Sequence, residues 1–143
     1  MATLSRITVR DLMTPNPLVV QAGTSLDQFV QAELLHRKQS GALVSERGRV
    51  IGDVGLEQVR RVPVQDLPTT TVGEVARRFH REELLKPSQP ASRALAHLMA
   101  NGAERLPVLD RGRLVGVLAR EDVRVYLAVR TDLLNREPDR TRI

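Results

Sequence analysis

The chain repeats one pattern of residues at an offset of 63 to 65 positions, and this repeat restricts its possible folds more than any other feature. A single copy of about 60 residues would bury too little surface to be comfortably stable alone, so two copies are expected to pack together. The matched segments are 9–13 with 72–76, 19–20 with 84–85, and 47–52 with 111–116.

Apolar periodicity and turn residues predict the order β-α-β-β-α within each copy. In the first copy we expect a strand at 18–20, a helix capped by Thr24 or Ser25 and running to about Lys38, strands at 41–44 and 50–54, and a helix at 56–61. In the second copy we expect an extended run at 84–85, a helix from Pro90 ended by Gly102, strands at 106–109 and 114–118, and a helix at 120–135.

The predicted fold class is therefore α/β (α+β), with two β-α-β-β-α repeats packed sheet to sheet under pseudo-two-fold symmetry. We expect the first repeat to cover residues 1–68 and the second to cover residues 69–143. The apolar stripes predicted for the two helices of the second repeat consist of Leu95, Leu98 and Met99, and of Val123, Leu127 and Leu134.

Composition excludes several classes of function. The chain has no cysteine, which rules out disulfides, cysteine-based zinc sites and thiol nucleophiles and fits a cytoplasmic location. No apolar run approaches the roughly 18 residues of a membrane span. His36, His80 and His97 lack metal-ligand spacing, and no catalytic constellation is visible, so we expect neither a metal site nor an enzyme.

The net charge of +5 comes almost entirely from arginine, and these arginines alternate with acidic residues along the chain. A compact basic stripe is absent, so the charge does not favour nucleic acid as a partner, although a basic nucleic-acid-binding module stays open as an alternative.

The order of short motifs resembles that of a tandem pair of CBS domains over about residues 8 to 130. The motifs that carry the resemblance are Met13-Thr14-Pro15, Leu106-Pro107-Val108, and Gly116-Val117-Leu118 leading into Arg120-Glu121-Asp122. Such pairs commonly bind adenosine-containing ligands between their repeats and tend to form homodimers. The resemblance therefore implies a non-catalytic regulatory module that binds an adenine nucleotide or S-adenosylmethionine, or a ligand-free dimerisation module.

A narrower resemblance links the segments 59–63 and 70–75 to the CBS pair at the C-terminus of site-two-type intramembrane zinc metalloproteases. The His-Glu-x-x-His zinc motif of that family is absent from this sequence. The resemblance implies that the chain is the regulatory tail of such a protease, on the cytoplasmic side of the membrane, without the catalytic domain.

The family's ligand motif contains a glycine, a Ser or Thr for a phosphate, and an Asp for the ribose. The second repeat keeps the ribose carboxylate as Asp122 but has Ala119 in place of the hydroxyl, and Arg120 could partly compensate as a charged partner for phosphate. The remaining residues implied for this cleft are Leu118, Leu18, Val20, Gln39 and Ser40. An equally open interpretation of Asp122 is a carboxylate that favours the start of a helix.

In the first repeat Gly55 and Gln58 replace both functional positions, so the resemblance implies a second cleft that has lost its ligand. The other residues implied for the second cleft are Leu85, Glu104 and Arg105. Gly52 and Gly116 admit a plainer explanation, because glycine within a strand often marks a close approach of another chain segment.

Overall fold

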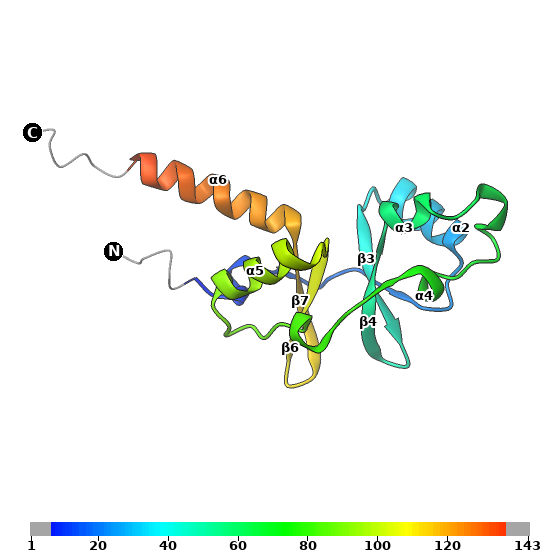
Figure 1. The fold of residues 1–143 in the computed structure, drawn as a ribbon, viewed down its shortest axis with the longest axis horizontal. Coiled ribbons are helices and arrows are strands. Elements are labelled where there is room, and N and C mark those ends of the chain that lie inside the picture. The colour runs from blue at the N-terminus through cyan, green and yellow to red at the C-terminus, as the bar shows by residue number, and fades with distance from the viewer. Residues whose placement is uncertain (1–6, 137–143) are drawn as a thin grey trace, which may run out of the picture.

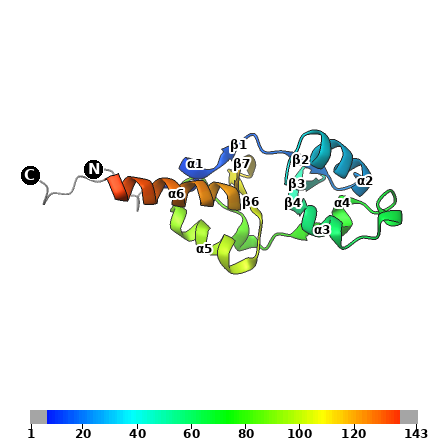
Figure 2. The ribbon, with the colours of Figure 1, turned by 90° about the horizontal axis from the view of Figure 1, so that it is seen from above.

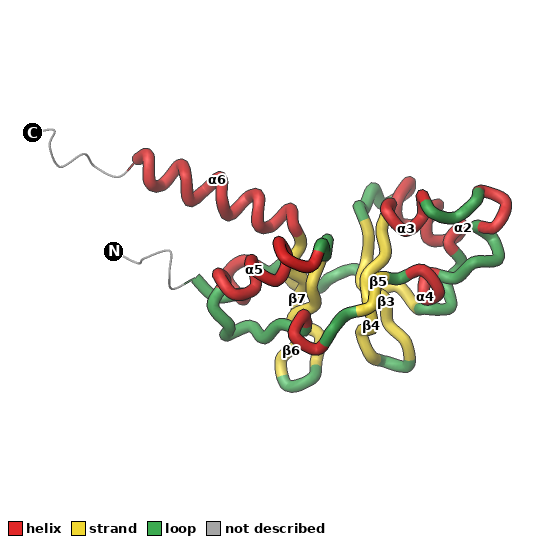
Figure 3. Tube along the Cα trace, viewed as in Figure 1, coloured by secondary structure: helices red, strands yellow, loops and turns green. Residues whose placement is uncertain are grey.

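A computed structural model describes residues 7–136 and shows two similar halves whose sheets meet in the middle of the molecule, with most helices on the outer sides (Figures 1 and 3). The first sheet has the strand order β2-β3-β4-β5, and the second has the order β1-β7-β6. The predicted α/β class with two repeats is confirmed, but the extended run at 84–85 in the second repeat forms only one bridge, between Leu85 and Val108, and not a strand. The strands are β1 (Thr14–Pro15), β2 (Val19–Gln21), β3 (Gly41–Glu46), β4 (Arg49–Gly55), β5 (Arg77–Arg78), β6 (Arg105–Asp110) and β7 (Arg113–Ala119).

Matched two-residue turns connect the long strands of each sheet. Arg47 and Gly48 turn between β3 and β4 with φ values of 52° and 78°, and Arg111 and Gly112 turn between β6 and β7 with φ values of 52° and 80°. Two successive positive φ values produce the tight turn whose twist matches that of paired antiparallel strands. The two hairpins therefore have the same geometry as well as similar sequence.

Helix boundaries follow the predicted caps. Ser25 accepts a hydrogen bond from the backbone N–H of Gln28 at the start of α2, and Gly102 ends α5 with a φ of 67°. The first-repeat helix continues from α2 into a π-helical segment, which the sequence did not predict. The helical elements are α1 (Val9–Leu12), α2 (Leu26–Phe29), η2 (Val30–His36), α3 (Leu56–Arg60), η3 (Val64–Asp66), α4 (Val72–Val75), η4 (Arg81–Glu83), α5 (Ala91–Asn101) and α6 (Arg120–Arg136).

Each repeat begins with one short helix, α1 or α4, that packs into the hydrophobic core of the other repeat. Val9 of α1 packs in one hydrophobic cluster with Leu98 and Leu106, whereas Val72 of α4 packs in the other with Leu26 and Phe29. The boundary between residues 68 and 69 stays a prediction about sequence repeats, because packing exchanges these two segments between the halves. The exchange ties the halves together.

Two predicted apolar stripes differ from the structure in part. Leu98 of α5 is buried, but the Met99 side chain is 68% exposed. Val123 of α6 is buried, whereas Leu127 is 46% exposed because α6 projects beyond the body of the molecule (Figures 1 and 2). The predicted core positions of Met99 and Leu127 are therefore wrong, and the side chain of Leu134 lies outside the described residues.

Among residues 7–136, none of the helices combines the length and apolar character that crossing a bilayer requires.

Candidate functional site

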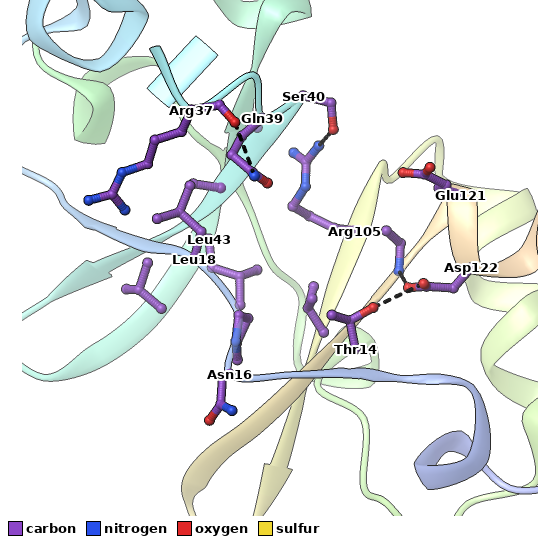
Figure 4. Close-up of a pocket in the computed structure, with 16 residues that line it drawn as sticks. Thr14, Asn16, Leu18, Arg37, Gln39, Ser40, Leu43, Arg105, Glu121 and Asp122 are labelled. Atoms are coloured by element: carbon purple, nitrogen blue, oxygen red, sulfur yellow. Dashed lines mark hydrogen bonds between the residues drawn. The ribbon is translucent and has the colours of Figure 1, made fainter. Parts of the chain in front are cut away.

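A cavity of about 560 Å³ lies between the two repeats, where the loop before β2 and the start of β3 face β7 and the start of α6 (Figure 4). The cavity is lined by Thr14, Asn16, Pro17, Leu18, Val19, Arg37, Gln39, Ser40, Gly41, Ala42, Leu43, Arg105, Val117, Ala119, Glu121 and Asp122. Both halves of the chain supply its walls, so a molecule bound there would contact both repeats. Its size falls within the range of small-molecule sites.

Charged groups of opposite sign lie on opposite sides of this cavity. Arg37 lies on the side of the first repeat, the Arg105 side chain reaches from β6 towards Ser40 of the first repeat, and Glu121 and Asp122 lie at the start of α6 (Figure 4). Aliphatic side chains such as Leu18 lie between them (Figure 4). The arrangement can receive a flat apolar group with hydroxyl donors at the acidic side and an anion at the basic side.

Asp122 is held by two hydrogen bonds within the protein. Its Oδ2 accepts from the backbone N–H of Ala119 at 2.8 Å, and its Oδ1 accepts from the hydroxyl of Thr14 at 3.0 Å. The first contact is the helix-start role that the sequence left open. A carboxylate has about four lone-pair sites, so each oxygen can still accept one more hydrogen bond.

Five of the residues predicted for the first cleft come together around the cavity, namely Leu18, Gln39, Ser40, Ala119 and Asp122. Val20 and Leu118 do not line it, because their side chains are buried in the two hydrophobic clusters. Neighbouring side chains along a strand point to opposite faces, so the adjacent residues Val19 and Val117 reach the cavity instead.

Arg120 also departs from its predicted position. Its Nε donates to the carbonyl oxygen of Ala103 at 2.7 Å, and its Nη2 donates to that of Leu98 at 3.0 Å. These carbonyls lie at the C-terminal end of α5, where a cationic donor satisfies groups that have no partner within the helix. Arg120 therefore stabilises the end of α5 and does not line the cavity.

Of the five residues predicted for the second cleft, Arg105 alone belongs to the lining of the cavity described above. Gln58 accepts a hydrogen bond from the N–H of Gly55 at 2.8 Å and so caps the start of α3, as Asp122 caps the start of α6. Leu85 is buried in a hydrophobic cluster and Glu104 is exposed. Arg105, the first residue of β6, lines the cavity already described.

Sequence reasoning missed a buried ion pair between the repeats. Nη1 of Arg105 lies 3.1 Å from Oδ2 of Asp53, whose side chain is 3% exposed. Burial raises the pKa of Asp53 from 3.8 to about 6, although Arg105 and Arg77 act to lower it. Asp53 follows Gly52 at a position where the second repeat has the apolar Val117, and this difference between the repeats was the available signal.

Among the described residues, no three or more His, Cys, Asp or Glu side chains gather closely enough to hold a metal ion.

Comparison with known proteins adds a family relationship. The family model described as the CBS domain matches residues 9–65 and 81–129, which together make up more than half of the chain. The two matched ranges correspond to the two repeats.

Two curated relatives are zinc metalloproteases by name, as the narrower sequence resemblance predicted. The chain is 29% identical over 119 residues to the protein named zinc metalloprotease Rip3 of Mycobacterium tuberculosis, covering 82% of this chain and 30% of that protein. It is 26% identical over 117 residues to zinc metalloprotease MJ0392 of Methanocaldococcus jannaschii, covering 82% of this chain and 31% of that protein. The chain thus spans less than a third of the length of these relatives.

A solved structure with a similar fold is that of CBSX2 in complex with AMP. It aligns with a TM-score of 0.69 at 27% sequence identity, and the alignment covers 86% of this chain and 98% of that chain.

Proposed function

The chain belongs to the CBS domain family, and from this premise we propose that it is a non-catalytic regulatory module that binds an adenosine-containing ligand between its repeats. The observation that carries the proposal is the cavity of about 560 Å³ that has Asp122 on one side and Arg37 and Arg105 on the other. CBSX2, which has the same fold, was solved in complex with AMP, and this supports an adenosine-type ligand here.

The ligand chemistry follows from the groups around the cavity. Asp122 accepts hydrogen bonds from the two ribose hydroxyls through lone pairs that Thr14 and Ala119 leave open. The base lies among the aliphatic side chains. Because Ala119 supplies no hydroxyl, the site favours adenosine or a lightly phosphorylated nucleotide over ATP, and binding is weak.

Regulation follows from the position of the ligand between the repeats. A ligand that contacts both halves favours the relative arrangement in which both contacts are made, and it shifts the population towards that arrangement. The relatives named zinc metalloproteases are about three times as long as the matched segment. We therefore propose that the module controls an attached or partner domain, namely a membrane zinc metalloprotease domain.

A thermal-shift series tests the proposal. AMP, ADP, ATP, adenosine and S-adenosylmethionine are each added to the purified chain, and any ligand that binds the native state raises the melting temperature with concentration. We expect AMP and adenosine to raise it and ATP to have the smallest effect. Absence of a shift for all five compounds at millimolar concentration would remove adenosine ligands from the proposal.

A matched pair of variants assigns any shift to the cavity. Asp122→Asn keeps a side-chain oxygen at the helix start but removes the charge that the ribose hydroxyls need, so the shift should disappear. Asp110→Asn changes an exposed carboxylate at the end of β6, away from the cavity, and should leave the shift intact. Equal shifts in both variants would contradict the role of Asp122.

A second candidate function, a homodimerisation module without a ligand, is favoured by the exposed apolar side chains of two helices. On α6 the exposed fractions are 58% for Val125 and 49% for Val129, and Met99 on α5 is 68% exposed. Side chains at i and i+4 lie on one face of a helix, so Val125 and Val129 form an apolar stripe. Burying this stripe against a second copy would remove the apolar surface from water.

A further inference from the structure

Strand pairing relates four uncharged residues that line the open cavity to four charged residues. Each charged residue occupies the equivalent position in the other repeat. Val117 lies opposite Thr14 in the pairing of β7 with β1, and Asp53 lies opposite Arg77 in the pairing of β4 with β5. Because these pairs occupy the same places in the two sheets, Asp53 corresponds to Val117, and Arg77 corresponds to Thr14.

Two more correspondences follow in the same way. Gly41 and Arg105 each begin the first strand of their hairpin, opposite the last residue of the second strand. Val20 pairs in parallel with Val44 of β3, and Leu85 pairs in parallel with Val108 of β6. Leu18 and Glu83 each lie two residues before the first member of these pairs. The equivalent pairs are Thr14 with Arg77, Leu18 with Glu83, Gly41 with Arg105, and Val117 with Asp53.

All four members of the first set line the open cavity, and none of them carries a charge. All four members of the second set are charged, and they pair with one another. Nη2 of Arg77 lies 2.6 Å from Oε2 of Glu83, and Nη1 of Arg105 lies 3.1 Å from Oδ2 of Asp53. The Glu83 side chain is 0% exposed and that of Asp53 is 3% exposed.

Arg105 crosses from the second repeat to reach its partners in the first. Nη1 also donates to the carbonyl oxygen of Val54 at 3.3 Å, and Nη2 donates to the hydroxyl of Ser40 at 3.4 Å. Gly41 makes room for it, since a Cβ atom on Gly41 would lie 2.5 Å from Nη1 of Arg105. The absence of a side chain at position 41 and the guanidinium at position 105 are thus complementary.

We propose that these four charged residues fill the second cleft as a built-in substitute for a ligand, so that the chain has one ligand site and its repeats are permanently linked on the other side. The Asp53–Arg105 ion pair is the contact that links the repeats. Arg77 and Glu83 fill the rest of the cleft, and their charges compensate each other. The statement about one ligand site rests on the proposed function, whereas the filling of the second cleft does not.

Because Asp53 and Arg105 are both largely buried, each depends on the other for compensation of its charge. Removing one partner of a buried pair leaves the other charge buried without compensation, so loss of either Asp53 or Arg105 alone should destabilise the arrangement in which the two repeats meet on this side. Arg105 also lines the open cavity, so the same residue contacts both the ligand site and Asp53 in the filled cleft. A ligand therefore acts on one side of the module only.

The stoichiometry of AMP binding tests the first part on the unmodified chain. Equilibrium dialysis with labelled AMP at saturating concentration should give one AMP per chain. Two AMP per chain would overturn the proposal, because the second cleft would then be open.

A double-mutant cycle tests the second part without any ligand. Asp53→Asn, Arg105→Met and the double variant are compared with the parent chain by urea unfolding. The unfolding equilibrium constant should show a coupling of about tenfold or more between the two residues, as expected for buried charges in contact. The matched control is Glu57 with Arg61, whose charged atoms are also 3.1 Å apart but whose side chains are 58% and 72% exposed. Its coupling should be about twofold.

The two measurements separate the failure of this inference from that of the proposed function. If AMP does not bind but the coupling is strong, adenosine binding fails and the filled cleft stands. If AMP binds once per chain but the Asp53–Arg105 coupling is no larger than the control, the link between the repeats is overturned. Should Arg105→Met fail to fold, Arg105→Gln replaces it in the cycle, because it also removes the positive charge but keeps a polar side chain at this position.

Discussion

The hydroxyl of Thr14 donates a hydrogen bond to Oδ1 of Asp122 at 3.0 Å, which joins residues 108 positions apart in the chain. Thr14 belongs to the segment that crosses to the second repeat and pairs with β7, and Asp122 lies in the first turn of the last helix. The crossing of the N-terminal segment therefore completes the polar side of the candidate ligand cleft.

Replacing Asp122 with alanine should affect both stability and binding. The change removes the acceptor for the N–H of Ala119 and for the hydroxyl of Thr14, so the free energy of unfolding should fall by about 1–2 kcal/mol. Any thermal shift with AMP should disappear as well. Thr14→Val, which removes only the second contact, should destabilise the chain less. Urea unfolding with and without AMP measures both effects, and an unchanged AMP shift in Asp122→Ala would contradict the site.

The buried carboxyl of Asp53 should make stability depend on pH. Its pKa is raised from 3.8 to about 6, so the folded chain holds this proton more tightly than the unfolded chain. The stabilising contribution of the proton is complete below pH 3.8 and is lost as the pH rises through about 6. The shift corresponds to roughly 3 kcal/mol, as an order of magnitude.

Asp53→Asn serves as the comparison for this pH dependence. The amide does not titrate, so the fall in unfolding free energy between about pH 4 and pH 6 that comes from Asp53 should be absent. Urea unfolding midpoints at half-unit pH intervals give the difference between the two chains. Parallel pH profiles would show that Asp53 does not titrate in this window.

Arg120→Ala should destabilise the chain without weakening ligand binding. The side chain donates to the carbonyl oxygens of Ala103 and Leu98, and loss of these charged hydrogen bonds should lower the free energy of unfolding by about 1–3 kcal/mol. Arg124→Ala removes an exposed arginine from the same helix and should change stability by less than about 0.5 kcal/mol. A loss of AMP affinity in Arg120→Ala with unchanged stability would favour the phosphate role inferred from sequence.

Gly52→Ala should separate the sheet from its edge strand. A Cβ atom at this position would collide with the backbone carbonyl oxygen of Arg77 in β5, which cannot move aside as a flexible side chain could. We expect a loss of about 1–3 kcal/mol in unfolding free energy. Gly23→Ala is the control, because no heavy atom lies within 4 Å of its added Cβ. Equal melting temperatures for the two variants would contradict the close approach.

Charged substitutions on α6 test the dimerisation module. Val125→Asp combined with Val129→Asp places two carboxylates in the exposed apolar stripe, and sedimentation equilibrium should then report a monomer where the parent chain is a dimer. Leu35→Asp combined with Val64→Asp changes two apolar side chains elsewhere that are still more exposed, at 64% and 79%, and should leave the dimer intact. A parent chain that is monomeric at high micromolar concentration would remove this candidate function.

Residue patterns along the chain were enough to predict the long strands and helices and their order, but not the π-helical segment η2 or the short elements α1, α4, β1 and β5. Short-range physics fixes the predicted elements: Ser25 caps a helix through a residue three positions on, Gly102 ends a helix through its own φ, and Arg-Gly pairs turn both hairpins. The repeat then predicted two such units, and the resemblance to CBS pairs implied Asp122 and the four other predicted residues that line the cavity.

Which side chains lie together depends on the packing of the two repeats against each other. Sequence cannot show that the segment containing Thr14 crosses to the second repeat, or that Arg120 turns to the end of α5. The charged group at the second cleft needs Asp53 and Arg105, 52 positions apart, to be brought together by packing of the two sheets. Contacts of this kind depend on the relative placement of whole elements, and local residue preferences carry no information about that placement.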